Sequence, residues 1–150
     1  MTTELNQWFG PVQAPSSAEL GDRLAASQLV KVYALGIDMR DYDLTRSAFA
    51  ADAVAEGSAG AGPIDDYLPK VFHGAAAFEA TQHNITNQHV TLNGDEALVW
   101  SYAIAVHQHA QDSGRGHLIM GVQYRDQCRR FPGGWLIAAR KVVVQWVKNG

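Results

Sequence analysis

The sequence has one cysteine and no cluster of basic residues, and these shortages exclude several classes of protein. Cys128 is the only cysteine among 150 residues, so no disulfide can form within the chain. The net charge is −3, and no basic run offers the electrostatic surface of a nucleic-acid-binding protein. No apolar run is long enough to cross a bilayer. We therefore expect a cytoplasmic protein that binds neither nucleic acid nor membrane.

The first fifteen residues differ from the rest of the chain. Residues 1–15 contain Pro11 and Pro15, lack the pattern of a signal peptide, and predict an irregular arm. We expect Trp8 and Phe9 of this arm to lie on an apolar surface of this chain or of a neighbour. Apolar residues make up 47% of the chain and charged residues 18%, which is enough to pack a core. A single domain over residues 16–150 is the expected organisation.

Helical spacing dominates the first third of the chain. Ser16 to Glu19 has the spacing of a capping box, which predicts the start of a helix. The residues that follow form one apolar stripe at intervals of three and four: Ala26, Val30, Tyr33, Ala34 and Ile37. A short helix is expected from Asp41 to Phe49, and the glycine-rich residues 56–63 are expected to form a loop.

The second half of the chain changes to a period of two, which is typical of strands. After a strand end and short helix expected over 71–80, four β-rich runs follow: 83–92, 96–108, 117–131 and 135–147. Asn93-Gly94 predicts a type I′ hairpin turn, and Pro132-Gly133-Gly134 predicts another reversal. Helices followed by long antiparallel strands indicate an α+β fold, in which one curved, mainly antiparallel sheet wraps the helices.

Asp38 breaks a pattern of buried residues. It continues the apolar stripe through Val30 and Ala34, and it lies in the last turn of its helix, where the helix dipole disfavours negative charge. Local stability therefore does not explain this aspartate, and we expect it to have a function. The alternative is that Asp38 caps the next helix, although Asp41 and Asp43 are better placed for that.

Two histidines lie at strand ends. His83 opens the first long strand, and His107 ends the second on the same face as the small residues Ser101, Ala103 and Ala105, which leave room for a ligand. An aspartate that binds one imidazole nitrogen makes the other nitrogen a better general base. Such a base can remove a proton next to a carbonyl, while His107 protonates or orients a departing hydroxyl. Tyr33 either polarises the carbonyl or simply packs on the sheet.

Metal binding and thiol catalysis are less well supported. His107 and His109 share a strand face, and Asp38 could complete a site of two histidines and one carboxylate. However, no compact metal-binding spacing is present, so we expect no metal and no cofactor. Cys128 lies in the middle of a strand, where a thiol usually packs in the core.

The order and spacing of several segments resemble a known family. These segments are Tyr33 with residues 37–44, Thr81-Gln82-His83, Ala105-Val106-His107, Gly116-His117, Tyr124-Arg125 and Gly134-Trp135. Over about residues 17–147 the chain is similar to the scytalone dehydratase and SnoaL-like group of the nuclear-transport-factor-2-like (cystatin-like) superfamily. The resemblance implies a cone-shaped α+β barrel, with helices on a strongly curved sheet and an internal apolar pocket.

The resemblance also implies roles for individual residues. Asp38 and His83 match the family's aspartate–histidine pair, and His107 matches its second catalytic histidine. In scytalone dehydratase this set removes the proton and expels the hydroxyl as water without a cofactor. A tyrosine works with such a pair in bile acid dehydratase, which implies this role for Tyr33.

The sequence also departs from the scytalone dehydratase pattern. The two water-holding tyrosines of that enzyme align with Ile37 and Gly57, and its pocket serine and asparagine align with Leu118 and Met120. With Ala105 beside them, these residues imply a small, apolar, cyclic substrate that carries a carbonyl group.

Other functions of the same fold stay open. An isomerase or cyclase would use the same pocket, and a non-catalytic subunit would resemble the small subunit of ring-hydroxylating dioxygenases. The second strand run also has a large apolar face, whose members are Trp100, Tyr102, Ile104 and Val106. If the small face lines a pocket, this face needs another cover. We therefore expect a homo-oligomer, a trimer as in the family's dehydratases or else a dimer.

Overall fold

The computed structural model describes residues 14–150, so Trp8 and Phe9 lie outside the described residues. The helices of the described part of the chain are α2 (Ser17–Asp38), α3 (Tyr42–Ser47) and α4 (Ile64–Ala75). The strands are β1 (Phe49–Gly57), β2 (Gly60–Pro63), β3 (Ala80–Asn93), β4 (Glu96–Gln108), β5 (Leu118–Phe131) and β6 (Gly134–Asn149). None of the described helices is long and apolar enough to span a membrane.

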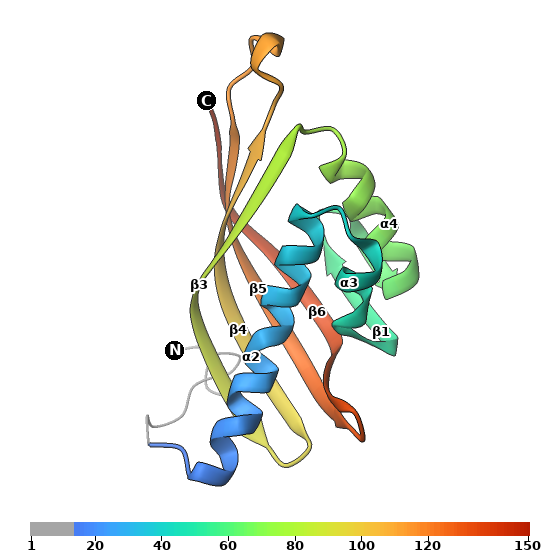
Figure 1. Ribbon diagram of the computed structural model, residues 1–150, viewed down its shortest axis with the longest axis vertical. Helices are drawn as coiled ribbons and strands as arrows, with labels where there is room; N and C mark the ends of the chain where they lie inside the picture. Colours follow the sequence, from blue (N-terminus) through green and yellow to red (C-terminus); the bar gives the residue numbers. More distant parts are fainter. Residues whose placement is uncertain (1–13) are drawn as a thin grey trace.

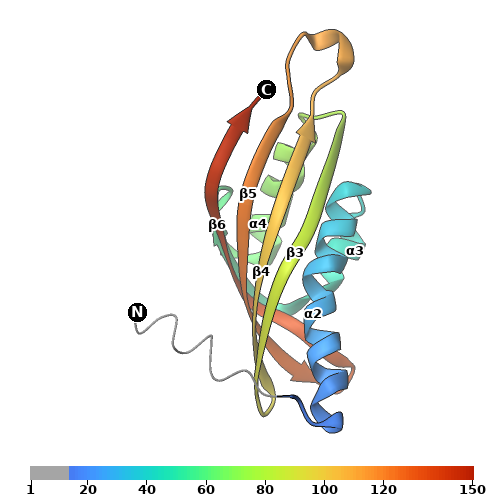
Figure 2. The ribbon, with the colours of Figure 1, turned by 90° about the vertical axis from the view of Figure 1, so that its left-hand side faces the viewer.

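The strands form one six-stranded sheet in the order β2-β1-β6-β5-β4-β3. Strands β3 to β6 form an antiparallel meander, whereas β1 runs parallel to β6 and antiparallel to β2. The described helices lie on the concave side of this sheet (Figure 1), and none of them covers the opposite face (Figure 2). The sheet curls but does not close, because β2 and β3 remain edges. The predicted α+β fold with helices on a curved sheet is confirmed.

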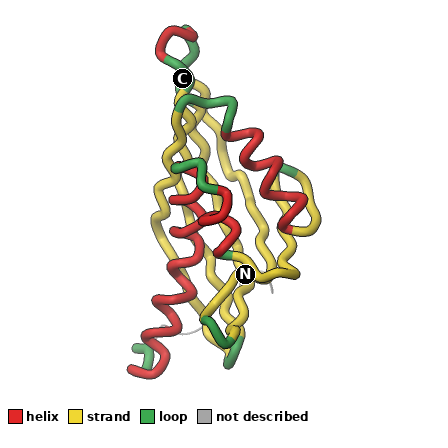
Figure 3. The backbone as a smooth tube through the Cα atoms, turned by 45° about the vertical axis from the view of Figure 1, so that its right-hand side comes forward, coloured by secondary structure: helices red, strands yellow, loops and turns green. Residues whose placement is uncertain are grey.

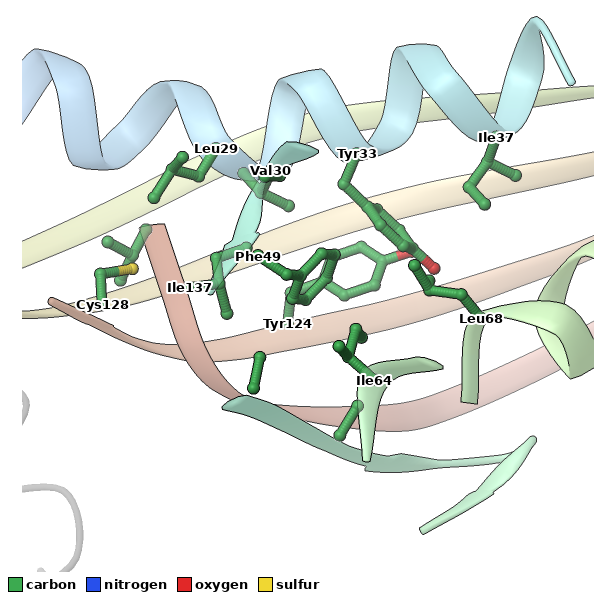
Figure 4. Close-up of a cluster of buried hydrophobic side chains, with 14 of the residues drawn as sticks. Leu29, Val30, Tyr33, Ile37, Phe49, Ile64, Leu68, Tyr124, Cys128 and Ile137 are labelled. Atoms are coloured by element: carbon green, nitrogen blue, oxygen red, sulfur yellow. The ribbon is translucent and has the colours of Figure 1, made fainter. Parts of the chain in front are cut away.

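Helix α2 is the central packing element of the core. Its capping box is confirmed, because the Glu19 backbone N–H donates to the Ser16 hydroxyl at 3.3 Å and Glu19 accepts from the Ser16 N–H at 3.2 Å. The whole predicted apolar stripe of the helix is buried. Val30, Tyr33 and Ile37 project from the helix toward Tyr124 and Ile137 of the sheet (Figure 4).

Two predictions between residues 41 and 63 are wrong. The short helix ends at Ser47, because Ile137 of β6 donates a backbone hydrogen bond to Ala48 and draws the following residues into the sheet. The glycine-rich residues 56–63 form the β1–β2 hairpin instead of a loop. Gly60 and Gly62 have φ values of 106° and 148°, which glycine adopts readily, so the strand can pair despite its composition.

The next two predictions of local structure are wrong in detail. Helix α4 begins at Ile64, well before the short helix expected within residues 71–80. The turn after β3 is not type I′, because Asn93 pairs with Glu96 and only Gly94 of the turn has a positive φ, 62°. A positive φ at the first turn residue alone is typical of type II′. The four long strands and the reversal at Pro132-Gly133 are confirmed.

The β4–β5 connection and the outer face of the sheet are two further features of the fold. The β4–β5 connection, which carries the 3-10 helix η1 (Gln111–Ser113), projects beyond the sheet (Figure 3). On the outer face Ile104 is 36% exposed, but Trp100 is only 3% exposed, contrary to the expectation for this apolar row. The guanidinium of Arg125 on β5 lies 4.1 Å from the centre of the Trp100 ring. The exposed part of the apolar face is therefore smaller than predicted.

Gly36 allows α2 and α3 to approach closely. A Cβ at residue 36 would meet the Thr45 hydroxyl and would lie 2.7 Å from the Thr45 backbone nitrogen. We expect Gly36→Ala to lower the free energy of unfolding by about 1–3 kcal/mol, because the two helices must separate. Gly21→Ala in the same helix is the control, since its Cβ would meet nothing within 4 Å and alanine favours helices by about 1 kcal/mol. Urea unfolding of both variants measures this, and equal losses would contradict the packing argument.

Candidate active site

A cavity of about 290 Å³ lies between the concave face of the sheet and helices α2 and α4. Its walls are mostly apolar, with Ile37 from α2, Val71 from α4 and Val122 from β5 among them. Ser58 and Lys70 are exposed and mark the place where the cavity meets solvent. An apolar cavity with a few polar groups is the usual form of a small-molecule site.

Asp38 and His83 meet beside this cavity. The Asp38 Oδ1 atom lies 2.7 Å from Nδ1 of His83 and accepts a hydrogen bond from the Thr81 hydroxyl at 2.9 Å. The other carboxylate oxygen accepts the backbone N–H of His83 at 2.8 Å. His83 lines the cavity whereas Asp38 does not, so the aspartate stands behind the histidine. The last turn of α2 thus positions an imidazole on β3.

The electrostatics of the pair indicate which of the two groups carries the shared proton. Burial raises the pKa of Asp38, but hydrogen bonds from His83 and Thr81 outweigh burial and hold this pKa below its usual value. Asp38 is therefore ionised at neutral pH and can only accept hydrogen bonds. Consequently neutral His83 carries its proton on Nδ1, and Nε2 keeps a free lone pair. This arrangement can accept a proton from a ligand.

His107 lies on the same side of the sheet as His83. The two ring centres are 5.7 Å apart and the rings are nearly perpendicular. Burial lowers the pKa of His107, and the nearby His83 lowers it further, so His107 is uncharged at neutral pH. Its Nδ1 is buried and has no hydrogen-bond partner within residues 14–150. His107 itself lines the cavity beside His83.

The residues considered for a metal site do not form a compact cluster. The Phe78 ring lies against both His107 and His109, with ring centres 4.8 Å apart in each case. No group of three histidine, cysteine or acidic side chains within the described part of the chain is arranged to hold a metal ion.

A second hollow, of about 810 Å³, lies around Leu92, Cys128 and Arg129. It is larger than the cavity at His83, but no histidine or tyrosine lines it. Cys128 is buried, and burial raises the pKa of its thiol, which leaves it a poor nucleophile. The groups with acid–base chemistry therefore gather at the smaller cavity.

The residues expected to contact substrate line the cavity at His83. Leu118 and Met120 of β5, Ala105 of β4 and Tyr33 of α2 all contribute to its wall. At Gly57, which aligns with a family tyrosine, no larger side chain fits, since a Cβ there would lie 2.7 Å from the Tyr67 hydroxyl.

Sequence reasoning did not find three of the polar lining residues. These are Tyr67, Lys70 and Tyr124. Tyr124 continues the alternation of Leu118 and Met120 along β5, so the period of two could have identified it. Nothing in the sequence brings Tyr67 and Lys70 of α4 to this cavity, because the start of that helix was not recognised.

The curled sheet, the helices on its concave side and the apolar cavity define an α+β protein of the small-molecule-binding kind. The model of the SnoaL-like domain matches residues 18–141. The chain belongs to this family.

Comparison with known proteins gives relatives in mycobacteria. The uncharacterized protein Rv2910c of Mycobacterium tuberculosis (strain ATCC 25618 / H37Rv) is 32% identical over 130 residues, which cover 83% of this chain and 86% of that protein. The uncharacterized protein Mb2934c of Mycobacterium bovis matches to the same extent.

Solved structures share the fold. A proposed scytalone dehydratase from Novosphingobium aromaticivorans DSM 12444 has a TM-score of 0.77 and 21% identity, and the match covers 88% of this chain and 89% of that one. The hexachlorocyclohexane dehydrochlorinase LinA-type3 from Novosphingobium barchaimii LL02 has a TM-score of 0.76 and 14% identity, over 88% and 92% of the two chains. At these identities the likeness shows the fold alone.

The hydrogen bonds to Asp38 make stability depend on pH. The folded pKa of Asp38 lies below its usual value of 3.8, so the folded state binds fewer protons than the unfolded state in acid. We expect the stability advantage of the wild type over Asp38→Asn to be complete above this value and to shrink as the pH falls below it. Urea unfolding from about pH 7 to about pH 2.5 measures the difference. Asp112→Asn, at an exposed residue of η1, is the control, and a pH-independent difference for Asp38→Asn would contradict the expectation.

Proposed function

We propose that this protein is a cofactor-independent lyase of the dehydratase type, which eliminates water from a cyclic compound with a carbonyl group. The observation that supports this most directly is the 2.7 Å contact between Asp38 and His83 at the wall of an apolar cavity. An ionised aspartate bound to Nδ1 of a histidine leaves the other ring nitrogen suited to general-base catalysis.

The reaction begins with a proton transfer to His83. Its Nε2 removes a proton from the carbon next to the substrate carbonyl, and the electrons of that C–H bond form an enolate. Asp38 stabilises the imidazolium that results, because its carboxylate is already bound to Nδ1. The Tyr33 hydroxyl polarises the carbonyl oxygen, which gains negative charge in this step.

The second step expels the hydroxyl group. The enolate electrons form the new double bond, the bond from the β-carbon to the hydroxyl oxygen breaks, and the imidazolium of His83 supplies the proton that completes water. Because His107 is uncharged at neutral pH, it orients the departing hydroxyl and does not protonate it. His83 returns to its neutral form, so no cofactor is consumed.

The cavity limits the substrate to a small, apolar molecule. A volume of about 290 Å³ accommodates a compound of one or two rings. Ala105, Leu118 and Met120 offer only apolar contacts to such rings, so polar substituents would lose their hydration without gaining partners.

An isomerase is the second candidate, since the same dyad can return the proton to another carbon. His107 favours the dehydratase, because it lines the cavity beside His83 and gives a departing hydroxyl a polar neighbour. A purely structural subunit is less favoured, because a cavity and not a filled core lies at the dyad.

Replacing either member of the dyad should slow turnover strongly while the protein stays folded at neutral pH. We expect His83→Ala and Asp38→Asn to lower kcat by at least about 100-fold on a β-hydroxy carbonyl substrate, which is the usual contribution of a positioned general base. Water loss is measured by mass spectrometry on a panel of cyclic β-hydroxy ketones.

His73→Ala is the matched control, because His73 is an exposed histidine of α4 that does not line the cavity. The control should keep wild-type turnover. If the His83 and Asp38 variants bind substrate less tightly but turn it over at the wild-type rate, the proposal is wrong.

We also propose that the chain forms a trimer through the outer face of the sheet. Ile104, Gly121 and Trp146 are paired neighbours across β4, β5 and β6, and none of the helices within residues 14–150 covers this face (Figure 2). Ile104 is 36% exposed and Trp146 is 47% exposed. Burial of such side chains against another subunit would be favourable.

A single charge on this outer face of the sheet should separate the subunits. We expect the wild type to have three times the mass of one chain in solution, and Trp146→Glu to have the mass of one, because burying a glutamate is costly. Leu24→Glu, on the exposed side of α2, is the control and should stay trimeric. Light scattering after size-exclusion chromatography measures these masses, and a monomeric wild type would refute the trimer.

A further inference from the structure

Two fully buried charges lie next to the cavity, and the proposed reaction uses neither. Asp126 of β5 and Arg140 of β6 are paired opposite each other in the sheet. Nε and Nη2 of Arg140 each donate to one carboxylate oxygen of Asp126 at 2.7 Å, and both side chains are 1% exposed. Removing two charges from water is costly, and an apolar pair could fill this space. The cost indicates that the pair has a role beyond packing.

The guanidinium of Arg140 lies in a cage of aromatic rings. Its Cζ is 4.2 Å from the ring centre of Tyr33, 4.8 Å from that of Tyr124 and 5.1 Å from that of Phe49. The rings of Tyr33 and Tyr124 are 5.5 Å apart and meet edge to face. A cation against a buried ring is held strongly, because water does not compete for it. The pair thus fixes the orientation of both tyrosines.

Both tyrosines that contact Arg140 also line the cavity. Tyr33 and Tyr124 line the cavity, and their hydroxyl ends lie on the same side, toward Ile37 and Leu68 (Figure 4). The Tyr124 hydroxyl forms no hydrogen bond with another residue of the described range. A ligand in the cavity is therefore an available acceptor for this hydroxyl, and Tyr33 approaches the same region from α2.

The charge of Arg140 is not fully cancelled at the tyrosines. Its Nη1 is buried without a hydrogen-bond partner within residues 14–150. Burial raises the pKa of Tyr33, and Arg140 opposes this rise more strongly than Asp126 adds to it. The tyrosine stays protonated at neutral pH, and the nearby positive charge makes its hydroxyl a stronger donor toward a negative oxygen.

We propose that the Asp126–Arg140 pair turns Tyr33 and Tyr124 into an oxyanion-binding site at the inner end of the cavity. The ligands of this site are compounds whose oxygen carries negative charge, such as an enolate or a phenolate. Arg140 is a positioning residue, since it acts through the two rings and does not line the cavity. The inference rests on the proposed function only for the place where the ligand binds.

Binding of phenols of similar size but rising acidity tests this site without any turnover. The probes are mono-, di- and trifluorophenols, with the matching fluorotoluenes as ligands that lack the hydroxyl. We expect the affinity of the wild type to rise with the acidity of the phenol. In Asp126→Asn/Arg140→Gln this rise should be lost, with about tenfold weaker binding of the most acidic phenol. Binding of the fluorotoluenes should change by less than about threefold. Titration calorimetry measures these affinities.

The double substitution removes both charges, so neither is left buried without its partner. Tyr33→Phe and Tyr124→Phe provide an independent test, because each removes one hydroxyl and keeps the ring. Each should weaken the dependence of affinity on acidity. If the double variant does not fold, these two variants decide the question.

The chain also offers a matched control pair. Arg130 donates to both oxygens of Asp22 at 2.7 Å, and its Cζ lies 4.6 Å from the ring centre of Trp135, but none of the three lines the cavity. Asp22→Asn/Arg130→Gln should bind the phenols as the wild type does.

Two results would overturn the inference. The first is a wild-type affinity that does not depend on the acidity of the phenol. The second is a dependence on acidity that stays as in the wild type in Asp126→Asn/Arg140→Gln and in both phenylalanine variants. Either result leaves the proposed function intact, because that is tested by turnover in the Asp38 and His83 variants. Conversely, loss of the proposed reaction would leave the phenol series unchanged.

Discussion

A carboxylate at the end of one helix, bound to the edge of the sheet, is the interaction on which the site depends. Asp38 accepts hydrogen bonds from the His83 backbone, the His83 ring and the Thr81 hydroxyl. Strand β3 is an edge strand, so its outward N–H groups have no neighbouring strand. Asp38 satisfies one of these groups and orients the imidazole at the same time. A single residue thereby joins the packing of α2 to the chemistry of His83.

The cavity is lined by two groups of polar residues and by many apolar ones. His83 and His107 come from β3 and β4, whereas Tyr33 and Tyr124 stand over the buried Arg140. In the proposed reaction the histidines move the proton, and the tyrosines bind the oxygen that gains charge. Both sets of residues are supported by a buried or half-buried carboxylate, which keeps each cationic or basic group in place without exposing it to water.

Local patterns identified those parts of the fold that local forces determine. The capping box at Ser16 and the apolar stripe of α2 follow from helix geometry, and the four long strands follow from a period of two. The errors lie where pairing with a distant strand overrides local preference. Phe49 joins β1 because β6 offers it a partner, and the glycine-rich residues 56–63 pair as a hairpin although glycine weakens strands.

The sequence by itself determined that Asp38 is out of place on an apolar stripe, and that His83 and His107 lie at strand ends. Periodicity can show this because it fixes the direction in which each side chain points. Only the tertiary structure decided which other residues lie beside these side chains and around the cavity. The register of β5 against β6 pairs Asp126 with Arg140, and the packing of α4 brings Tyr67 to the cavity. Register and helix packing depend on contacts between residues far apart in the chain, which no local pattern contains.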